Sequence, residues 1–382
     1  MTHAAMTRQG MGHDAPLLKR FTMTEAECLA RMVAPGTRRP GKYREGVIQI
    51  HVTRACDKAC FNCTQGSNYG GKTEFMSPDH FAQAVDSLKG YFGVLGVFGG
   101  NPAMSPHFEE YCRILRESWV PFNQRGLWCN NIRSQENAEA ARATFDPSVS
   151  NINVHLDKDA WAAFRAWWPE AHVVGTAQDS RHSPVFVAMK DVVRKDCSEC
   201  RGVGGYCHDP RNPGEVTDLC GTCDQSGQIV DDSRIWELIS GCDINQHWSA
   251  MIGVFRGQLR AWFCEIAGAQ SILHQDEPDY PDTGHKPELP TLYKGEVVAW
   301  WQLPMLAFAA QVRKHCFDCG VPLRGWGELA QAEKGCEQVS QTHASVAHPK
   351  RRDRPIQIVD RLEQLGIGRM KKMTHYLQNA TK

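Results

Sequence analysis

Residues 56–63 of the chain are Cys56-Asp57-Lys58-Ala59-Cys60-Phe61-Asn62-Cys63. The three cysteines are separated by three and then by two residues, and they follow an apolar run, residues 47–52, that predicts a β-strand. Three thiolates on one loop can bind three irons of a cubane iron–sulfur cluster and leave the fourth iron without a protein ligand. A structural zinc site instead needs four ligands, usually in CxxC pairs. The spacing therefore favours a reactive cluster over an ordinary zinc or ferredoxin-like site.

This CxxxCxxC motif resembles the signature of the radical S-adenosylmethionine (radical SAM) superfamily, which lies at the end of the first barrel strand. The resemblance makes Cys56, Cys60 and Cys63 the catalytic cluster ligands and implies that the open iron binds S-adenosylmethionine. It further implies a one-electron reductant of the flavodoxin or ferredoxin type, and a 5′-deoxyadenosyl radical that abstracts a substrate hydrogen. The family usually has an aromatic residue just before the third cysteine. This chain has Asn62 there, so Phe61 becomes the candidate contact to the adenine.

The composition is that of a globular protein. The chain has 382 residues, 42% of them hydrophobic, and zero formal net charge, which gives no general attraction to nucleic acid or to a membrane. Residues 1–20 are polar and show no signal peptide, so we expect a cytoplasmic protein. Sixteen cysteines in such a chain are more often metal ligands than disulfides. The most apolar run, residues 297–312, is shorter than the roughly 20 residues that a bilayer requires, and it predicts a buried helix and no membrane partner.

Predicted strands and helices alternate along the first half of the chain. Apolar runs of strand length recur at residues 47–52, 94–98, 126–129 and 152–156. Helices are expected after Ser77-Pro78 and Ser105-Pro106, and over residues 134–145 and 158–168. Such alternation is typical of a parallel sheet. Together with the resemblance, it predicts the α/β class and a partial (β/α)6 TIM-type barrel, whose chemistry would lie at the C-terminal ends of the strands.

Polar residues follow three of these strands. Gly99-Gly100-Asn101-Pro102 comes after the second strand and resembles the family's GGEP-type motif, which holds the methionine amino group of the cofactor. The Asn101 amide oxygen can accept a hydrogen bond as the usual glutamate does, without its charge. Asn130-Asn131 follows the third strand, and Asn153 and His155 lie at the fourth. The resemblance implies cofactor contacts for Asn130, Asn153 and His155, although asparagine also suits ordinary loop starts.

Two CxxC pairs, Cys197-Ser198-Glu199-Cys200 and Cys220-Gly221-Thr222-Cys223, lie further along the chain. Four thiolates in two tight turns suit tetrahedral zinc, and an iron–sulfur cluster on the same cysteines is the alternative. The first pair continues as CxxCxGxG through Gly202 and Gly204, whereas the second departs from this repeat at Gln225. The pattern resembles the zinc-binding repeats of the DnaJ chaperone family, whose glycines permit tight turns. We expect a zinc staple in an inserted loop rather than a substrate-binding finger.

Two further apolar segments, residues 247–255 and 258–264, predict either a hairpin or the last barrel strands. Cys264 ends the second segment. The candidate metal ligands here, with Cys242 as the substitute, are Cys264, Cys316, Cys319 and Cys336. They would suffice for one auxiliary [4Fe–4S] cluster, and they resemble the C-terminal extensions of radical SAM enzymes without the full seven-cysteine arrangement. Zinc on the same four cysteines is the competing interpretation, in which the metal would only stabilise the fold.

These features divide the chain into five predicted parts. They are a leader and linker (1–45), the first part of the barrel (46–193), the zinc-binding insertion (194–232), the last barrel strands with an auxiliary metal-binding extension (233–345), and a basic C-terminal helix or tail (346–382). In the tail, apolar residues at helical spacing between Ile356 and Leu365 predict an amphipathic helix.

The sequence thus predicts a radical SAM enzyme with a [4Fe–4S] cluster, S-adenosyl-L-methionine, zinc and an auxiliary cluster. The cysteines of the C-terminal part suggest a peptide or protein substrate, whereas the zinc module and the basic residues 350–354 suggest a nucleotide or nucleic acid. One rival hypothesis is a zinc-stapled binding module without radical chemistry. Another is a protein that binds the cluster but does not cleave the cofactor, because Asn62 and Asn101 replace the usual residues.

Overall fold

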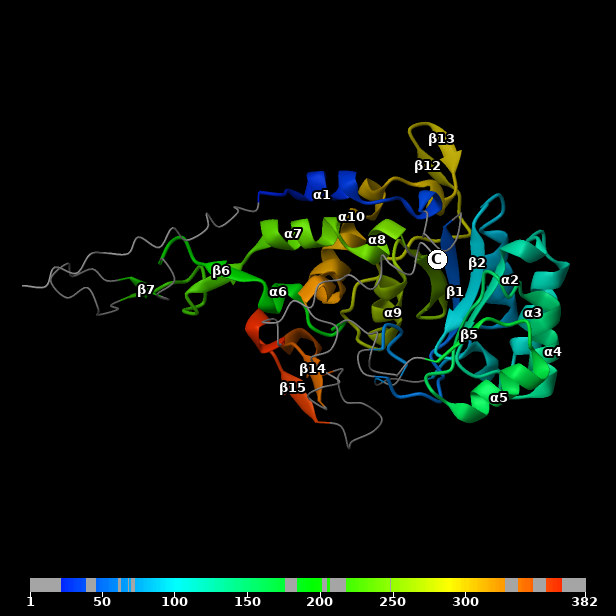
Figure 1. Ribbon diagram of the computed structural model, residues 1–382. Coiled ribbons are helices and arrows are strands. Elements are labelled where there is room, and N and C mark those ends of the chain that lie inside the picture. The colour runs from blue at the N-terminus through cyan, green and yellow to red at the C-terminus, as the bar shows by residue number, and fades with distance from the viewer. Residues whose placement is uncertain are drawn as a thin grey trace, which may run out of the picture.

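The computed structural model describes residues 22–38, 46–60, 63–67, 69, 73–175, 184–200, 205–206, 218–247, 249–326, 336–345 and 355–365. Its largest sheet has the strand order β11-β10-β1-β2-β3-β4-β5 (Figure 1). These strands are β1 (Val47–Thr53), β2 (Val94–Gly99), β3 (Arg125–Cys129), β4 (Asn151–Asn153), β5 (Val173–Val174), β10 (Ser249–Phe255) and β11 (Gln258–Trp262).

Most of this sheet is parallel. Strands β1 to β5 pair in parallel with their neighbours in chain order, and β10 pairs in parallel with the other side of β1. Strand β11 returns antiparallel to β10 through Arg256 and Gly257, both of which have a positive φ. The fold is therefore α/β with a mostly parallel sheet, consistent with a partial TIM-type barrel, and this prediction is confirmed. The hairpin β10–β11 extends the sheet beyond β1 and does not follow β5.

The helices that connect the first strands form a layer on one side of the sheet (Figure 1). They are α2 (Pro78–Asp86), α3 (Phe108–Glu117), α4 (Gln135–Thr144) and α5 (Lys158–Trp167). The side chains of Ser77, Ser134 and Asp157 accept hydrogen bonds from the first turns of α2, α4 and α5. Helix α3 begins later than its sequence predicts, because the Ser105 hydroxyl accepts from the His107 N–H in the turn before it.

Helices of the second half lie on the other side of the sheet, together with the N-terminal helix (Figure 1). They are α1 (Glu25–Arg31), α6 (Met189–Val192), α7 (Asp232–Ser240), α8 (Asp243–His247), α9 (Glu265–Leu273) and α10 (Ala309–Gln311). Helix α1 packs on α7, buries Cys28 and Leu29, and begins at a capping box of Thr24 with Glu27. Part of the predicted leader therefore belongs to the folded body.

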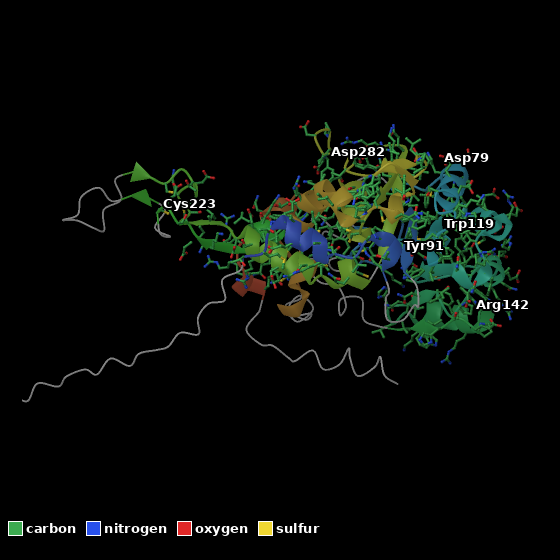
Figure 2. All side chains as sticks on the ribbon, turned by 90° about the horizontal axis from the view of Figure 1, so that it is seen from above. Asp79, Tyr91, Trp119, Arg142, Cys223 and Asp282 are labelled. Carbon is green, nitrogen blue, oxygen red and sulfur yellow. The ribbon has the colours of Figure 1, made fainter. Side chains whose placement is uncertain are left out.

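A narrow ribbon projects from this half of the molecule. It consists of β6 (Arg194–Asp196) paired with β9 (Gln228–Val230), and of the short hairpin β7 (Gly205–Tyr206) with β8 (Asp218–Leu219). Figure 2 shows Cys223 on this ribbon at the opposite end of the molecule from Arg142 of α4. The glycines of the first CxxCxGxG repeat lie outside the described residues.

Two segments differ from the prediction. Residues 297–312 are not one buried helix, because Pro304 cannot donate a backbone hydrogen bond. They begin in β13 (Glu296–Val298), which pairs with β12 (Thr291–Tyr293), and continue as short helical turns.

Near the C-terminus, β15 (Ile356–Ile358) pairs in parallel with β14 (Glu337–Val339) where a helix was expected. Ile356 and Ile358 are β-branched and therefore suit a strand, and the edge of β14 provides the pairing partner. The helical spacing of the apolar residues does not reveal that partner. The basic residues 350–354 lie outside the described part.

In the part of the chain that the structure describes, no helix has the length and apolar character to cross a membrane. The core instead lies between the sheet and the helices that cover it. Phe81 of α2 is an example: its side chain is fully buried, and its ring centroid lies 4.6 Å from that of Tyr111 on α3.

Replacing Phe81 tests how far the helical layer depends on this packing. We expect Phe81→Ala to lower the free energy of unfolding by about 3–5 kcal/mol, because a buried ring is lost and a cavity remains. Phe92→Ala is the matched control, since Phe92 is 75% exposed. Its loss should change stability by less than about 0.5 kcal/mol. Denaturant unfolding measures both variants, and equal losses would contradict the packing argument.

Candidate functional site

The cysteine loop begins where β1 ends and is held by the ends of neighbouring strands. The Asn130 side chain, which follows β3, donates a hydrogen bond to Cys56 Sγ over 3.2 Å. Lys58 forms an ion pair with Asp157, the N-cap of α5 after β4. The loop therefore lies at the C-terminal ends of β1, β3 and β4, which is where barrels of this type place their chemistry.

The Gly-Gly-Asn-Pro turn after β2 runs beside the start of the same loop. The backbone N–H groups of Gly100 and Asn101 donate to the carbonyl oxygens of Thr53 (2.8 Å) and Ala55 (2.6 Å). A side chain at Gly100 would overlap the Ala55 carbonyl, so this close approach requires glycine. Asn101 Nδ2 donates to the Asn131 carbonyl over 2.9 Å, which leaves Oδ1 as the acceptor end of the amide.

Two amide oxygens beside the loop are buried and have no hydrogen-bond partner among the described residues. They are Asn101 Oδ1, on a fully buried residue, and Asn130 Oδ1, on a residue that is 6% exposed. A buried acceptor without a hydrogen-bond partner lowers the stability of the fold by about 1–3 kcal/mol, so such an atom calls for an explanation. A ligand with N–H groups fits at this position, because it would supply the donors that the protein lacks.

The three thiols of the loop suit a cluster better than a single ion. Cys60 is buried, whereas Cys56 and Cys63 are half-buried. Burial raises the pKa of the Cys56 thiol to about 12, with a further contribution from Cys63, so a metal cation is needed to favour the thiolate. Three thiolates on one loop leave the fourth iron of a cubane open, whereas a structural zinc site needs four ligands.

The other residues predicted to contact the cofactor are only partly described by the structure. Phe61 lies outside the described residues. Pro102 is buried at the start of the 3-10 helix Pro102–Met104, beside β2. Asn153 Oδ1 accepts from the His155 N–H over 3.2 Å, and His155 has a left-handed backbone with φ 51°. The Asn153 side chain therefore shapes the turn on which His155 lies.

The four cysteines of the ribbon form a compact buried group. The Sγ atoms of Cys197, Cys200, Cys220 and Cys223 all lie within 4.8 Å of one another. Two of the separations are 3.9 Å (Cys197 to Cys220) and 3.6 Å (Cys200 to Cys223). Sulfurs bound at about 2.3 Å to one tetrahedral zinc ion would lie about 3.8 Å apart, so these four thiols could hold such an ion. Gln225, which departs from the DnaJ-like repeat, keeps the left-handed backbone of the turn with φ 66°.

A second group of cysteines lines a cavity between α8, α9 and the π-helix Val312–Cys316. The lining cysteines, each at most 7% exposed, are Cys242, Cys264, Cys316 and Cys319. The cavity that these cysteines surround is small. These thiols do not form a group within 4.8 Å, unlike those of the ribbon. Four thiols around one cavity could hold a [4Fe–4S] cluster with one thiolate per iron, or a single zinc ion.

Cys336 lies away from this cavity. Its thiol is 3.8 Å from Gln357 Oε1 of β15, and it is not among the residues that line the cavity. Cys242, the substitute candidate, occupies the wall just after α7. We therefore replace Cys336 by Cys242 in the candidate ligand set. Spacing could not reveal this choice, because Cys242 reaches the cavity only through the packing of α7.

The π-helix is held in place by Gln311, which precedes it. Gln311 Oε1 accepts from the Phe263 N–H over 3.0 Å, and Nε2 donates to the Thr283 carbonyl over 2.9 Å. These bonds fix the register in which His315 and Cys316 reach the cavity wall. Turns of π-helix are frequent at functional sites, and no feature of the sequence predicted this one.

Two buried ionisable groups adjoin the cavity. Arg38, from the predicted leader, is fully buried. Burial lowers the pKa of Arg38, and the neighbouring Cys264 and Cys242 thiols oppose that shift. Glu265 accepts a hydrogen bond from Ser249, and burial raises its pKa to about 7. Arg38 therefore lies near Cys242 and Cys264 and also near the Glu265 carboxyl, which can balance its buried charge.

Comparisons with known proteins concern the fold. No protein-family model matches the chain, and no curated protein matches it. Among solved structures, the chain is similar to the crystal structure of BtrN in complex with AdoMet and 2-DOIA, with 12% sequence identity and a TM-score of 0.34. That similarity covers 62% of this chain and 83% of the BtrN chain.

Two cysteine variants test the revised ligand set. In protein reconstituted anaerobically with iron and sulfide, we expect Cys242→Ala to retain less iron than the wild type, because the proposed auxiliary cubane would be held by three thiolates instead of four. Cys336→Ala is the matched control and should keep its iron, since Cys336 lies outside the cavity. Analysis of iron and acid-labile sulfide measures the difference. Iron loss from Cys336→Ala alone would restore the original ligand set.

Proposed function

We propose that this protein is a radical SAM enzyme. The observation that carries the proposal is the convergence of several strand ends on the three-cysteine loop, where two buried amide oxygens are left as acceptors. A structural zinc site would need a fourth ligand and would have no use for these acceptors. An open iron with a bound cofactor accounts for both features.

Each residue of the loop has a role in this proposal. Cys56, Cys60 and Cys63 hold a [4Fe–4S] cluster, and Asn130 orients Cys56 by donating to its sulfur. Asn101 accepts a hydrogen bond from the amino group of S-adenosyl-L-methionine through Oδ1. A [4Fe–4S] cluster held there would, when reduced by a flavodoxin- or ferredoxin-type donor, supply the electron for reductive cleavage of the sulfonium. The backbone of Gly100 holds the loop against β2, so that these groups keep their positions.

Two further metal centres belong to the proposal. We assign an auxiliary [4Fe–4S] cluster to Cys242, Cys264, Cys316 and Cys319, supported by the cavity that they share. Zinc is assigned to the four ribbon cysteines, supported by sulfur separations that match one tetrahedral ion. There it would stabilise a ribbon that has little apolar core of its own.

The substrate that we propose is a peptide or protein, or else a nucleotide or nucleic acid. The auxiliary site supports the first class. The zinc module, on a ribbon that projects from the body, supports the second (Figure 1). The alternative function is a zinc-stapled binding module without radical chemistry. It accounts for the ribbon cysteines but not for the buried amide oxygens of Asn101 and Asn130, which it leaves without a hydrogen-bond donor.

Anaerobically reconstituted protein tests the enzyme hypothesis. We expect iron, sulfide and zinc in the wild type, and a low-temperature electron paramagnetic resonance signal of the reduced cluster that changes when S-adenosyl-L-methionine is added. Reductive cleavage of the cofactor should give 5′-deoxyadenosine, measured by chromatography. The control, Cys56→Ala/Cys60→Ala/Cys63→Ala, should lose the cofactor-sensitive signal and the cleavage activity but keep the remaining iron.

Other outcomes would support the rivals. Zinc without iron after reconstitution would favour the stapled binding module. Iron with a cofactor-sensitive signal but without 5′-deoxyadenosine would favour a protein that binds the cluster and does no radical chemistry.

A further inference from the structure

The ammonium group of Lys58, between Cys56 and Cys60, forms an ion pair with the carboxylate of Asp157. The two side chains are 9% and 27% exposed, so the pair is largely shielded from solvent. Asp157 ends the turn between β4 and α5. The ion pair therefore joins the loop that carries the three cysteines directly to this turn.

The two carboxylate oxygens of Asp157 have separate partners. Oδ1 accepts hydrogen bonds from the backbone N–H groups of Asp159 and Ala160, both over 3.0 Å, and caps α5. Oδ2 accepts from Lys58 Nζ. The helix cap uses only Oδ1, so capping does not explain why a lysine of the cysteine loop is nearly buried beside Oδ2. Lysine is rarely buried without such a partner, and the contact needs a reason of its own.

The backbone just before Asp157 is strained. His155 and Leu156 have φ values of 51° and 65°, in the left-handed region that residues other than glycine seldom adopt. Burial does not offset the strain at Leu156, whose side chain is 63% exposed. Within the turn, Asn153 Oδ1 accepts from the His155 N–H, and the Val154 carbonyl accepts from the Asp157 N–H over 2.9 Å. Strain of this kind persists only where surrounding contacts maintain it, and it is concentrated at functional sites.

We propose that the Lys58–Asp157 ion pair holds this turn against the cysteine loop, and that the two residues thereby position the turn for S-adenosyl-L-methionine bound at the open iron. The inference rests on the proposed function, because the cluster and the cofactor belong to that function. The resemblance to radical SAM enzymes implies a cofactor contact for His155, which lies on the turn. Lys58 and Asp157 act through the turn, so they are positioning residues and not catalytic residues.

The cysteines themselves have other supports, on the side of β3. Cys56 Sγ accepts a hydrogen bond from the Asn130 side chain, and Asp57 Oδ2 accepts one from Asn131 Nδ2 over 3.1 Å. Neither contact involves the Lys58 side chain or β4. We therefore expect loss of the ion pair to release the turn while the cysteines keep their cluster. Weaker cofactor binding with unchanged iron is the result that distinguishes this role from general support of the loop.

The test uses the full chain after anaerobic reconstitution, with Lys58→Met and Asp157→Asn. Methionine keeps an unbranched side chain without the charge, and asparagine keeps an oxygen for the helix cap. Arg142→Met is the matched control, because it removes an ion pair with Glu170 whose side chains are 55% and 47% exposed. Iron and acid-labile sulfide are measured first. The cofactor is then titrated into the reduced protein, and its binding is followed by the change in the electron paramagnetic resonance signal.

We expect Lys58→Met and Asp157→Asn each to need about tenfold more S-adenosyl-L-methionine for half of the spectral change, which is about 1.4 kcal/mol of binding free energy. Their iron content should equal that of the wild type. Lys58→Arg keeps a cation that can pair with the carboxylate, so it should restore most of the affinity. Arg142→Met should leave the affinity unchanged. Wild-type affinity in both Lys58→Met and Asp157→Asn, or an equal loss in Arg142→Met, would overturn the proposal.

A further substitution tests whether the ion pair acts through the turn. Asparagine adopts the left-handed conformation more readily than leucine, so Leu156→Asn reduces the strain that the ion pair opposes. In that background we expect Lys58→Met to weaken cofactor binding by less than about threefold, because the two positions are coupled. A tenfold loss in both backgrounds would show that Lys58 does not act through the turn, and the proposed role would be wrong.

Hydrogen exchange in the metal-free chain gives a readout that needs no cofactor. We expect Lys58→Met to speed amide exchange in residues 153–157, and Arg142→Met to leave it unchanged. If the reconstituted wild type shows no cofactor-sensitive signal, the proposed function is wrong, and the positioning role is wrong with it. If the wild type responds to the cofactor and the variants bind it equally well, only the role of the ion pair is wrong. Iron loss in Lys58→Met as large as in Cys56→Ala/Cys60→Ala/Cys63→Ala would also overturn that role, because the ion pair would then support the cysteines themselves.

Discussion

The geometry of the proposed catalytic site depends on how closely the backbone after β2 approaches the backbone after β1. The N–H groups of Gly100 and Asn101 donate to Thr53 and Ala55, and this spacing leaves no room for a side chain at Gly100. The pairing continues past the ends of the two strands and reaches the residue just before Cys56. The described part of the cysteine loop has no helix or strand of its own, so its start takes its shape from this contact.

The same contact determines where the polar groups of the site point. The Asn101 amide donates to the carbonyl of Asn131, and the Asn130 amide donates to Cys56. Both amide oxygens are thereby left as buried acceptors without a partner among the described residues. Asn130 contacts the cysteine loop through Cys56, and Asn101 contacts it through the backbone bond to Ala55.

The two groups of four cysteines differ in the distances between their sulfurs. In the ribbon the sulfurs lie as close as ligands of one small ion, with separations of 3.6 and 3.9 Å. In the cavity they are more widely spaced and surround empty volume, beside a buried arginine. Thiolates that share one ion must be close together, whereas thiolates on separate irons of a cubane must be apart. Local spacing in the sequence brings each CxxC pair together, Cys316 and Cys319 included, whereas Cys242 and Cys264 reach the cavity from segments far apart in the chain.

What the sequence determined by itself is mostly local. The strand and helix alternation from residue 46, the cap Ser77, the three-cysteine loop and the two CxxC pairs all depend on neighbours within a few residues, and the structure has each of these elements. Only the tertiary structure decided which distant residues meet. It placed Cys242 rather than Cys336 in the cavity, and it brought Arg38 of the leader beside it. It also paired residues 356–358 with β14 in place of a helix. The physical reason is the same in each case: burial and strand pairing act between segments far apart in the chain, and their energies outweigh the local preferences that a sequence displays.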